Sequence, residues 1–113
     1  MLGPQYVTIP QSGTVSGAFS LRNTALAGVW VPVVTSGQLL VQAAHGHDET
    51  APNSADFLRV MRTDGSTPFA ANVVAGSVYL PLTDISGGLA WARFETQNPQ
   101  TDVRTFVVMS KAR

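Results

Sequence analysis

The segment HGHDE, at residues 45–49, is the cluster in this 113-residue chain whose side chains best suit metal chemistry. His45 and His47 are two positions apart, so on an extended segment both imidazoles point to the same side. Together with Asp48 or Glu49 they would offer nitrogen and oxygen ligands to a metal ion. The chain has only these two histidines and no cysteine. Two interpretations stay open, a two-histidine metal site and a solvated polar loop, and we expect the loop.

Catalytic arrangements find little support elsewhere in the sequence. There is no G-x-S-x-G motif, and both histidines lie in one loop, which does not favour a serine nucleophile with a distant base. SGGL, at residues 86–89, precedes a predicted strand rather than a helix, so it is not a phosphate-binding loop. The carboxylates that could pair for glycoside hydrolysis are Asp48, Glu49, Asp56, Asp64, Asp84, Glu95 and Asp102. All but Glu95 lie in or beside predicted turns, where aspartate serves turn conformation. We expect a protein that is not an enzyme, without catalytic residues, metal or cofactor.

The charge balance argues against one class of partner, and the lengths of the apolar runs argue against another. Seven Lys and Arg residues against seven Asp and Glu residues give a net charge of zero. Without a basic excess, no nucleic-acid partner is expected. No run of about 18 apolar residues is present, so no membrane partner is expected either. Charged residues make up 12% of the chain, against roughly 25% in typical domains. With so few charges, the electrostatic repulsion between molecules is weak, which suits a component of an assembly.

The elements that position these residues are strands. No segment of a dozen residues holds a helical apolar period, whereas strand-length runs alternate with turns rich in Gly, Pro and Ser. The predicted strands are 5–9, 14–22, 26–34, 39–44, 57–61, 69–74, 77–82, 89–96 and 104–109. Eight or nine short strands predict an all-β fold, an antiparallel β-sandwich of jelly-roll or Greek-key type, in one domain covering residues 1–113.

Alternation within each run predicts which side chains form the core of this sandwich. The predicted core residues are Val15, Phe19, Leu21, Leu26, Leu40, Val60, Leu80, Phe94 and Val107. The faces depend on register, because a shift of one residue exchanges them.

The run GVWVPVV, at residues 28–34, is apolar on both faces, whereas a half-buried strand normally has one polar face. Pro32 cannot donate a ladder hydrogen bond, so an edge or a bulge is predicted. An apolar edge needs a cover. Two covers stay open, the N-terminal segment of the same chain and a neighbouring subunit or larger surface, and we expect the neighbour. The predicted interface comprises Val29, Trp30, Val31, Pro32, Val33 and Trp91.

Trp91 shares its predicted strand face with Arg93 and Glu95, opposite the smoother face that holds Phe94. This placement predicts a partly exposed indole. Together with Trp30 or the tyrosines Tyr6 and Tyr79, it could contact a sugar or a protein partner. The alternative is a core tryptophan whose indole N–H is hydrogen-bonded.

The order of four segments carries a resemblance to a known group of proteins. The segments are VTIPQSGTVSGAFSLRNTALAGVWVPVV, GQLLVQAA, AGSVYLPLTDISGGLAWARFET and RTFVVMSKAR. In this order, from about Val7 to Val108, they resemble small structural proteins of tailed-bacteriophage and prophage virions. The loops HGHDETAPNSADF and FETQNPQTD depart from that pattern, so contacts in these loops are not carried over.

The resemblance implies a non-enzymatic virion protein. Its first implication is a capsid decoration, or cement, protein that binds the major capsid protein and stabilises the shell. It would be assembled in the host cytoplasm and lie on the capsid exterior. A homotrimer would suit the three-fold positions of an icosahedral shell. The alternative is a tail or head-fibre attachment module that binds host-surface carbohydrate.

Overall fold

The computed structural model describes residues 4–21, 24–35, 37–45, 52–61, 65–73, 78–82 and 90–112. Its elements are β1 (Gln5–Ile9), β2 (Phe19–Ser20), β3 (Thr24–Val31), β4 (Gln38–Ala44), the 3₁₀ turn η1 (Ser54–Asp56), β5 (Leu58–Arg59), β6 (Ala70–Asn72), β7 (Val78–Pro81), β8 (Trp91–Thr96) and β9 (Arg104–Ala112). The predicted all-β class is confirmed.

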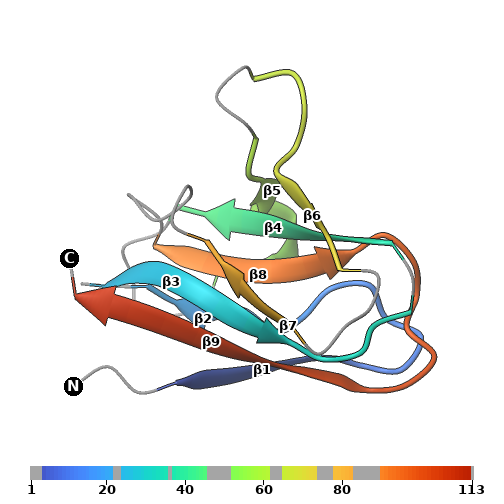
Figure 1. Ribbon diagram of the computed structural model, residues 1–113. Coiled ribbons are helices and arrows are strands. Elements are labelled where there is room, and N and C mark those ends of the chain that lie inside the picture. The colour runs from blue at the N-terminus through green and yellow to red at the C-terminus, as the bar shows by residue number, and fades with distance from the viewer. Residues whose placement is uncertain are drawn as a thin grey trace.

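The strands form two antiparallel sheets that pack face to face (Figure 1). We call the four-stranded sheet, with the order β1-β9-β3-β7, sheet 1. Sheet 2 has the order β2-β8-β4-β5, and β6 also pairs with β4. This arrangement is the predicted antiparallel β-sandwich. In both sheets, neighbouring strands come from distant parts of the sequence, so the pairing closes long loops.

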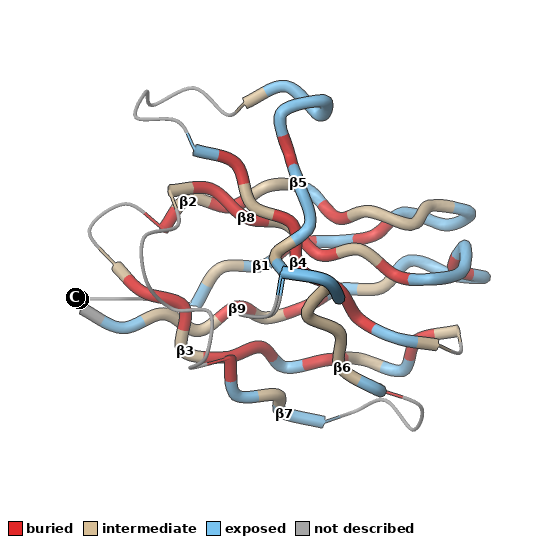
Figure 2. Tube along the Cα trace, turned by 90° about the horizontal axis from the view of Figure 1, so that it is seen from above, coloured by how far each residue is buried: buried red, intermediate tan, exposed pale blue. Residues whose placement is uncertain are grey.

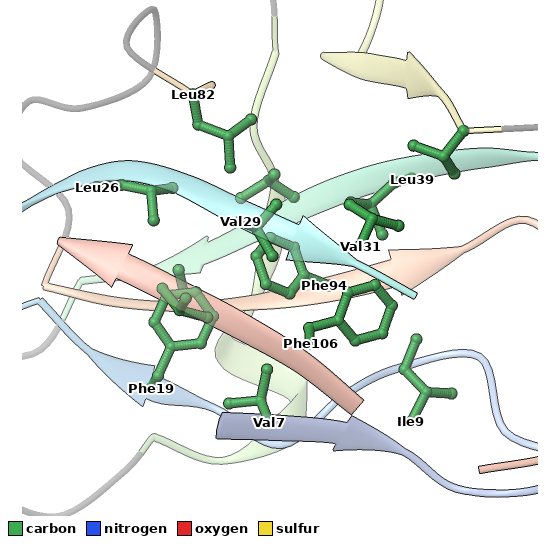
Figure 3. Packing of buried hydrophobic residues seen from close by; sticks show 14 of the residues in the cluster. Val7, Ile9, Phe19, Leu26, Val29, Val31, Leu39, Leu82, Phe94 and Phe106 are labelled. Atoms are coloured by element: carbon green, nitrogen blue, oxygen red, sulfur yellow. The ribbon is translucent and has the colours of Figure 1, made fainter. Parts of the chain in front are cut away.

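The core lies between the two sheets and draws side chains from both (Figure 3). Phe94 of β8 lies at its centre and is fully buried. Its ring centroid is 5.3 Å from that of Phe19 and 5.4 Å from that of Phe106. Figure 2 shows that buried positions gather in the strands, while many exposed positions lie in the turns. Three rings from three strands therefore link the two sheets.

The predicted core is confirmed at Phe19, Leu21, Leu26 and Phe94, all in the buried cluster. Val60 and Leu80 are partly buried and pack against this cluster. Leu40 is buried as predicted, at 7% exposure, although it lies outside this cluster, and the structure corrects Val15 and Val107. Val15 is only half-buried.

Leu40 and Val107 each lie on the outer face of their sheet. Leu40 is buried, but its neighbours Leu39 and Val41 take the core positions of β4. Val107 is half-buried, and its neighbours Phe106 and Val108 point inward instead. At both positions the face assigned from the sequence is off by one residue, and such a shift exchanges the inner and outer faces of a strand.

A bulge in β3 breaks the alternation of faces just before the run GVWVPVV. Leu26 pairs with Ser110 and Gly28 with Met109, so Ala27 is an extra residue on β3. Because of this extra residue, Leu26 and Val29 both reach the core although they are three positions apart. Regular alternation would place Leu26 and Trp30 on one face, but Leu26 is buried in the core and Trp30 is 53% exposed.

The position of Pro32 also differs from the prediction. β3 lies between β9 and β7, in the interior of sheet 1, and it ends at Val31. Pro32 therefore follows the strand and does not lie within an edge strand. The described part of the N-terminal segment, residues 4–9, does not cover β3 either, because β1 extends the sheet on the far side of β9. β1 is thus the edge strand of sheet 1 and does not lie over β3.

Candidate functional site

Four side chains form a continuous row across the outer face of sheet 1. The register places Tyr6 of β1 opposite Val107 of β9, Val107 opposite Trp30 of β3, and Trp30 opposite Tyr79 of β7. Tyr6 is 68% exposed, Trp30 53% and Tyr79 40%. We call these four residues the aromatic row. Directly opposed side chains of neighbouring strands lie close enough to contact each other.

The two rings at one end of the row pack on each other. The ring centroids of Trp30 and Tyr79 are 4.7 Å apart and the planes are tilted by 54°. Gly28, two residues before Trp30, leaves room for the phenol ring of Tyr79. Trp30 is therefore held by a neighbour while more than half of it stays exposed.

The remaining outward positions of sheet 1 carry no charge over most of the face. Phe106 and Val108 point into the core, so the alternate residues of β9 and of the turn before it face outward. The uncharged outward residues around the row are Thr8, Pro81, Val103, Thr105 and Met109. Among the described residues of this face, the first charged side chain is Lys111, near the end of β9. We call this surface the uncharged face.

The outer face of sheet 2 is polar instead. Arg59 of β5 donates two hydrogen bonds to Glu95 of β8, from Nε to Oε1 at 2.9 Å and from Nη2 to Oε2 at 2.6 Å. Gln42 of β4 donates a third from Nε2 to Oε1 of Glu95 at 2.9 Å. Arg93 donates from Nε to Oε1 of Gln42 at 2.5 Å and from Nη1 to Oγ of Ser54 at 2.9 Å. This network joins β4, β5, β8 and the η1 turn.

Electrostatics identify Glu95 as a structural carboxylate. The hydrogen bond from Arg59 lowers the pKa of Glu95 below its ordinary value, against the opposing effect of partial burial. Partial burial lowers the pKa of Arg93. A general acid in glycoside hydrolysis needs a raised pKa, so that it stays protonated. Glu95, with its lowered pKa and three donors, lacks that property.

Part of the 52–60 segment covers one end of sheet 2. Phe57, which follows η1, forms a second buried cluster with Trp91 and Ala44. The guanidinium carbon of Arg93 is 4.5 Å from the centroid of the Phe57 ring. Trp91 is therefore only 9% exposed. Among the described residues, its indole Nε1 has no hydrogen-bond partner.

The prediction of a partly exposed Trp91 is thus wrong. The alternative of a core tryptophan is right about its burial, while the described residues include no hydrogen-bond partner for its indole N–H. The sequence signal was Phe57, a large apolar residue just after a polar loop. Its aromatic side chain lies against the strand face that would otherwise be open.

The structure separates the residues of the predicted interface. Val29 and Val31 lie in the core and are at most 2% exposed, so their side chains cannot reach a partner of the folded chain. Pro32 is half-buried. Trp30 and Val33 are exposed, at 53% and 55%. The prediction did not include Val107, which completes the aromatic row. The alternation of side chains along β9 could have identified Val107 as outward-facing, but the two faces were assigned one residue out of register.

The candidate cluster HGHDE, for which a solvated loop was expected and a metal site was the alternative, is only partly described. His45 is exposed at the end of β4, and His47, Asp48 and Glu49 lie outside the described residues. Within the described ranges, no three His, Cys, Asp or Glu side chains are placed to hold a metal ion. Whether the two histidines bind a metal ion is therefore left to direct measurement of metal content.

The remaining carboxylates of interest serve turns where they are described. Asp56 accepts a hydrogen bond from the Asn53 N–H at 3.2 Å, and Asp102 accepts one from the Val103 N–H at 2.8 Å. Both contacts are the turn chemistry expected for aspartate. Asp64 and Asp84 lie outside the described residues.

The surface of sheet 1 is thus the strongest candidate for function, as a contact surface. None of the helical structure in the described ranges is long and apolar enough to span a bilayer. Comparisons with protein-family models, curated proteins and solved structures found no match.

Proposed function

We propose that this protein is a non-enzymatic structural component of a bacteriophage particle. In this role it decorates the capsid, binds the major capsid protein and stabilises the shell as a symmetric homo-oligomer. The observation that carries the proposal is the uncharged face, with Trp30 exposed at the middle of the aromatic row. The order of sequence segments that resembles virion proteins gives the context, and the trimer expected from it stays a prediction.

The chemistry of the face suits contact with another protein. Interface cores are depleted of charged residues and enriched in Tyr, Trp and Met, and Tyr and Trp bury large areas at low entropic cost. Two tyrosines, Trp30 and Met109 lie on this face, and the charged network lies on the other sheet. A patch of this kind on a chain with few charges favours association over an isolated monomer.

A sugar-binding attachment module is the second candidate. Exposed Trp and Tyr rings can stack on sugar rings, and the aromatic row supplies three such rings. The tilt of 54° between Trp30 and Tyr79 prevents these two rings from forming one flat platform. Thr8 and Thr105 are the polar side chains that the described part of the face offers beside the row. Protein contact therefore fits the face better.

Sedimentation with emptied, expanded phage heads tests the proposal. The wild-type protein should pellet with the heads and raise the temperature at which they disintegrate. Trp30→Asp should abolish both effects, because the charge would be buried without a partner. Leu58→Asp is the matched control, since Leu58 is 72% exposed on sheet 2.

Three outcomes would overturn the decoration role. The first is a wild-type protein that ignores the heads, and the second is a Trp30→Asp protein that binds them as well as wild type. The third is binding to host glycans that requires Trp30, without binding to heads. That outcome would establish the attachment module instead.

A further inference from the structure

We infer that the uncharged face is covered by the same face of a second copy of this chain. The two copies form a two-fold pair whose axis runs parallel to the strands of sheet 1. This inference rests on the proposed function: the uncharged face joins two copies of the symmetric homo-oligomer, and the pair binds the shell through its other surfaces.

On each edge of sheet 1, one backbone position is not available to an added strand. Leu82 donates its N–H to the carbonyl of Ala27 at 3.0 Å. Pro81, one residue earlier, therefore directs its backbone toward the open side of β7, where it has no N–H to donate. On β1, the carbonyl of Thr8 accepts the N–H of Gly17 at 3.2 Å. These two positions interrupt the pattern of hydrogen bonds that an added strand would need, which favours association through the face of sheet 1.

Charge favours a second copy as the occupant of that face. A charged partner surface would lose its hydration against the aromatic row, where no described side chain could neutralise it. The same face of a second copy brings no charge to the contact until Lys111. The two faces can therefore be buried together without an unpaired charge at the centre.

The order of large and small side chains in the row selects the axis. The order across the strands is Tyr6, Val107, Trp30 and Tyr79. An axis parallel to the strands places Trp30 of one copy over Val107 of the other, and Tyr6 over Tyr79. An axis perpendicular to the strands, within the contact plane, would stack Trp30 on Trp30. The first arrangement sets the largest side chain against the smallest, as close packing requires.

The size of the face indicates a reversible pair. The strands β1, β9, β3 and β7 have 5, 9, 8 and 4 residues, and at about 3.3 Å per residue and about 4.8 Å between strands they cover about 400 Å² per copy. A standard stable interface buries about 800 Å² per partner. Dimerisation should therefore depend on concentration in the range of a sedimentation experiment. A two-fold contact uses one patch on both copies and closes on itself, which differs from the trimer expected from the sequence.

Cross-linking between cysteine variants tests the pairing, because the chain has no cysteine of its own. Packed sheets lie about 10 Å apart, so a short bis-maleimide reagent spans the contact. A tagged Tyr6→Cys protein is mixed with an untagged Tyr79→Cys protein, and both keep Trp30. We expect a cross-linked heterodimer from the mixture and little product from either variant alone. Leu58→Cys, on sheet 2, is the control that should give none.

The reverse pattern would overturn the inference. Tyr6→Cys that cross-links to itself, or a mixture that yields no more product than the Leu58→Cys control, contradicts an axis parallel to the strands. A wild-type protein that sediments as a monomer at all concentrations, or as a closed trimer, contradicts the two-fold pair. A trimer that binds heads would still leave the decoration role standing. Conversely, a cross-linked pair that ignores heads would contradict that role and leave the pairing intact.

Discussion

The phenol ring of Tyr79 occupies the space that a β-carbon on Gly28 would fill, although Gly28 is paired directly with Pro81. Tyr79 therefore leans along β7 and covers the backbone of β3 diagonally. The same tilt brings its ring to 4.7 Å from that of Trp30, measured between centroids. The absence of a side chain at residue 28 thus shapes one end of the aromatic row.

Gly28→Ala should displace the Tyr79 ring and destabilise the fold by about 1–3 kcal/mol, the usual cost of overpacking. The carbonyl oxygen of Leu80 would lie 2.8 Å from the new β-carbon, and backbone cannot move aside easily. Urea unfolding and tryptophan fluorescence measure the two effects. Gly17→Ala is the control, because no atom lies within 4 Å of its β-carbon position. Equal stability of the two variants would contradict the close contact.

Val31→Asp and Trp30→Asp should fail in different ways, although the residues are adjacent. Val31 is 2% exposed and lies in the core, so a carboxylate there should prevent stable folding. Trp30 is 53% exposed, so Trp30→Asp should keep the β-sheet circular dichroism spectrum and lose only association. A folded Val31→Asp protein would refute the assignment of faces in β3.

Glu95→Gln should lower the melting temperature at neutral pH but have little effect in acid. The pKa of Glu95 is lowered in the folded chain, chiefly by the hydrogen bond from Arg59. The ion pair therefore stabilises the fold above the unfolded-state pKa of about 4.3, and this contribution is lost as the pH falls through the lower folded-state pKa. Thermal melts from pH 7 to pH 3 should show the two proteins converging. A gap that persists at pH 3 would assign the effect to packing.

Phe94→Ala should cost about 3–5 kcal/mol, because a large side chain leaves a cavity when it is removed from a core. Phe94 is fully buried and contacts the rings of Phe19 and Phe106. Val33→Ala, at a position that is 55% exposed, should change stability by less than about 0.5 kcal/mol. Urea midpoints, with unchanged slopes, measure both. A similar loss in the two variants would argue against a core centred on Phe94.

His45→Ala combined with His47→Ala should leave folding and head binding nearly unchanged. His45 is exposed, and exposed side chains contribute little to stability. Elemental analysis of the purified wild-type protein should find no stoichiometric zinc, nickel or iron. Stoichiometric metal that the double substitution removes would establish the two-histidine site.

Local patterns in the sequence determined the class of fold. The alternation in QYVTI and the Pro10 that follows it give the strand Gln5–Ile9 with the bounds that the structure has. The long run at 26–34 and the run at 104–109 likewise correspond to β3 and β9. Such runs reflect a period of two residues, which depends on neighbours along the chain and not on the partner strand.

Other bounds depended on which partner strand was available. The run at 14–22 is a strand only at Phe19–Ser20, with an isolated bridge between Val15 and Glu95. The run at 57–61 pairs with β4 only at Leu58–Arg59. A strand continues only where a neighbour supplies hydrogen bonds, and the sequence does not contain that information.

The uncharged face was decided by the tertiary structure alone. Val107 was assigned to the core but lies half-buried on the outer face of sheet 1, and Trp91 was expected to be partly exposed but is buried. The bulge at Ala27 changes which residues of β3 point outward, and the ring of Phe57 covers the strand face of Trp91. Register, bulges and cover arise from contacts between residues far apart in the chain. A period of two residues specifies that two faces exist, but only the packing of the second sheet decides which one is buried.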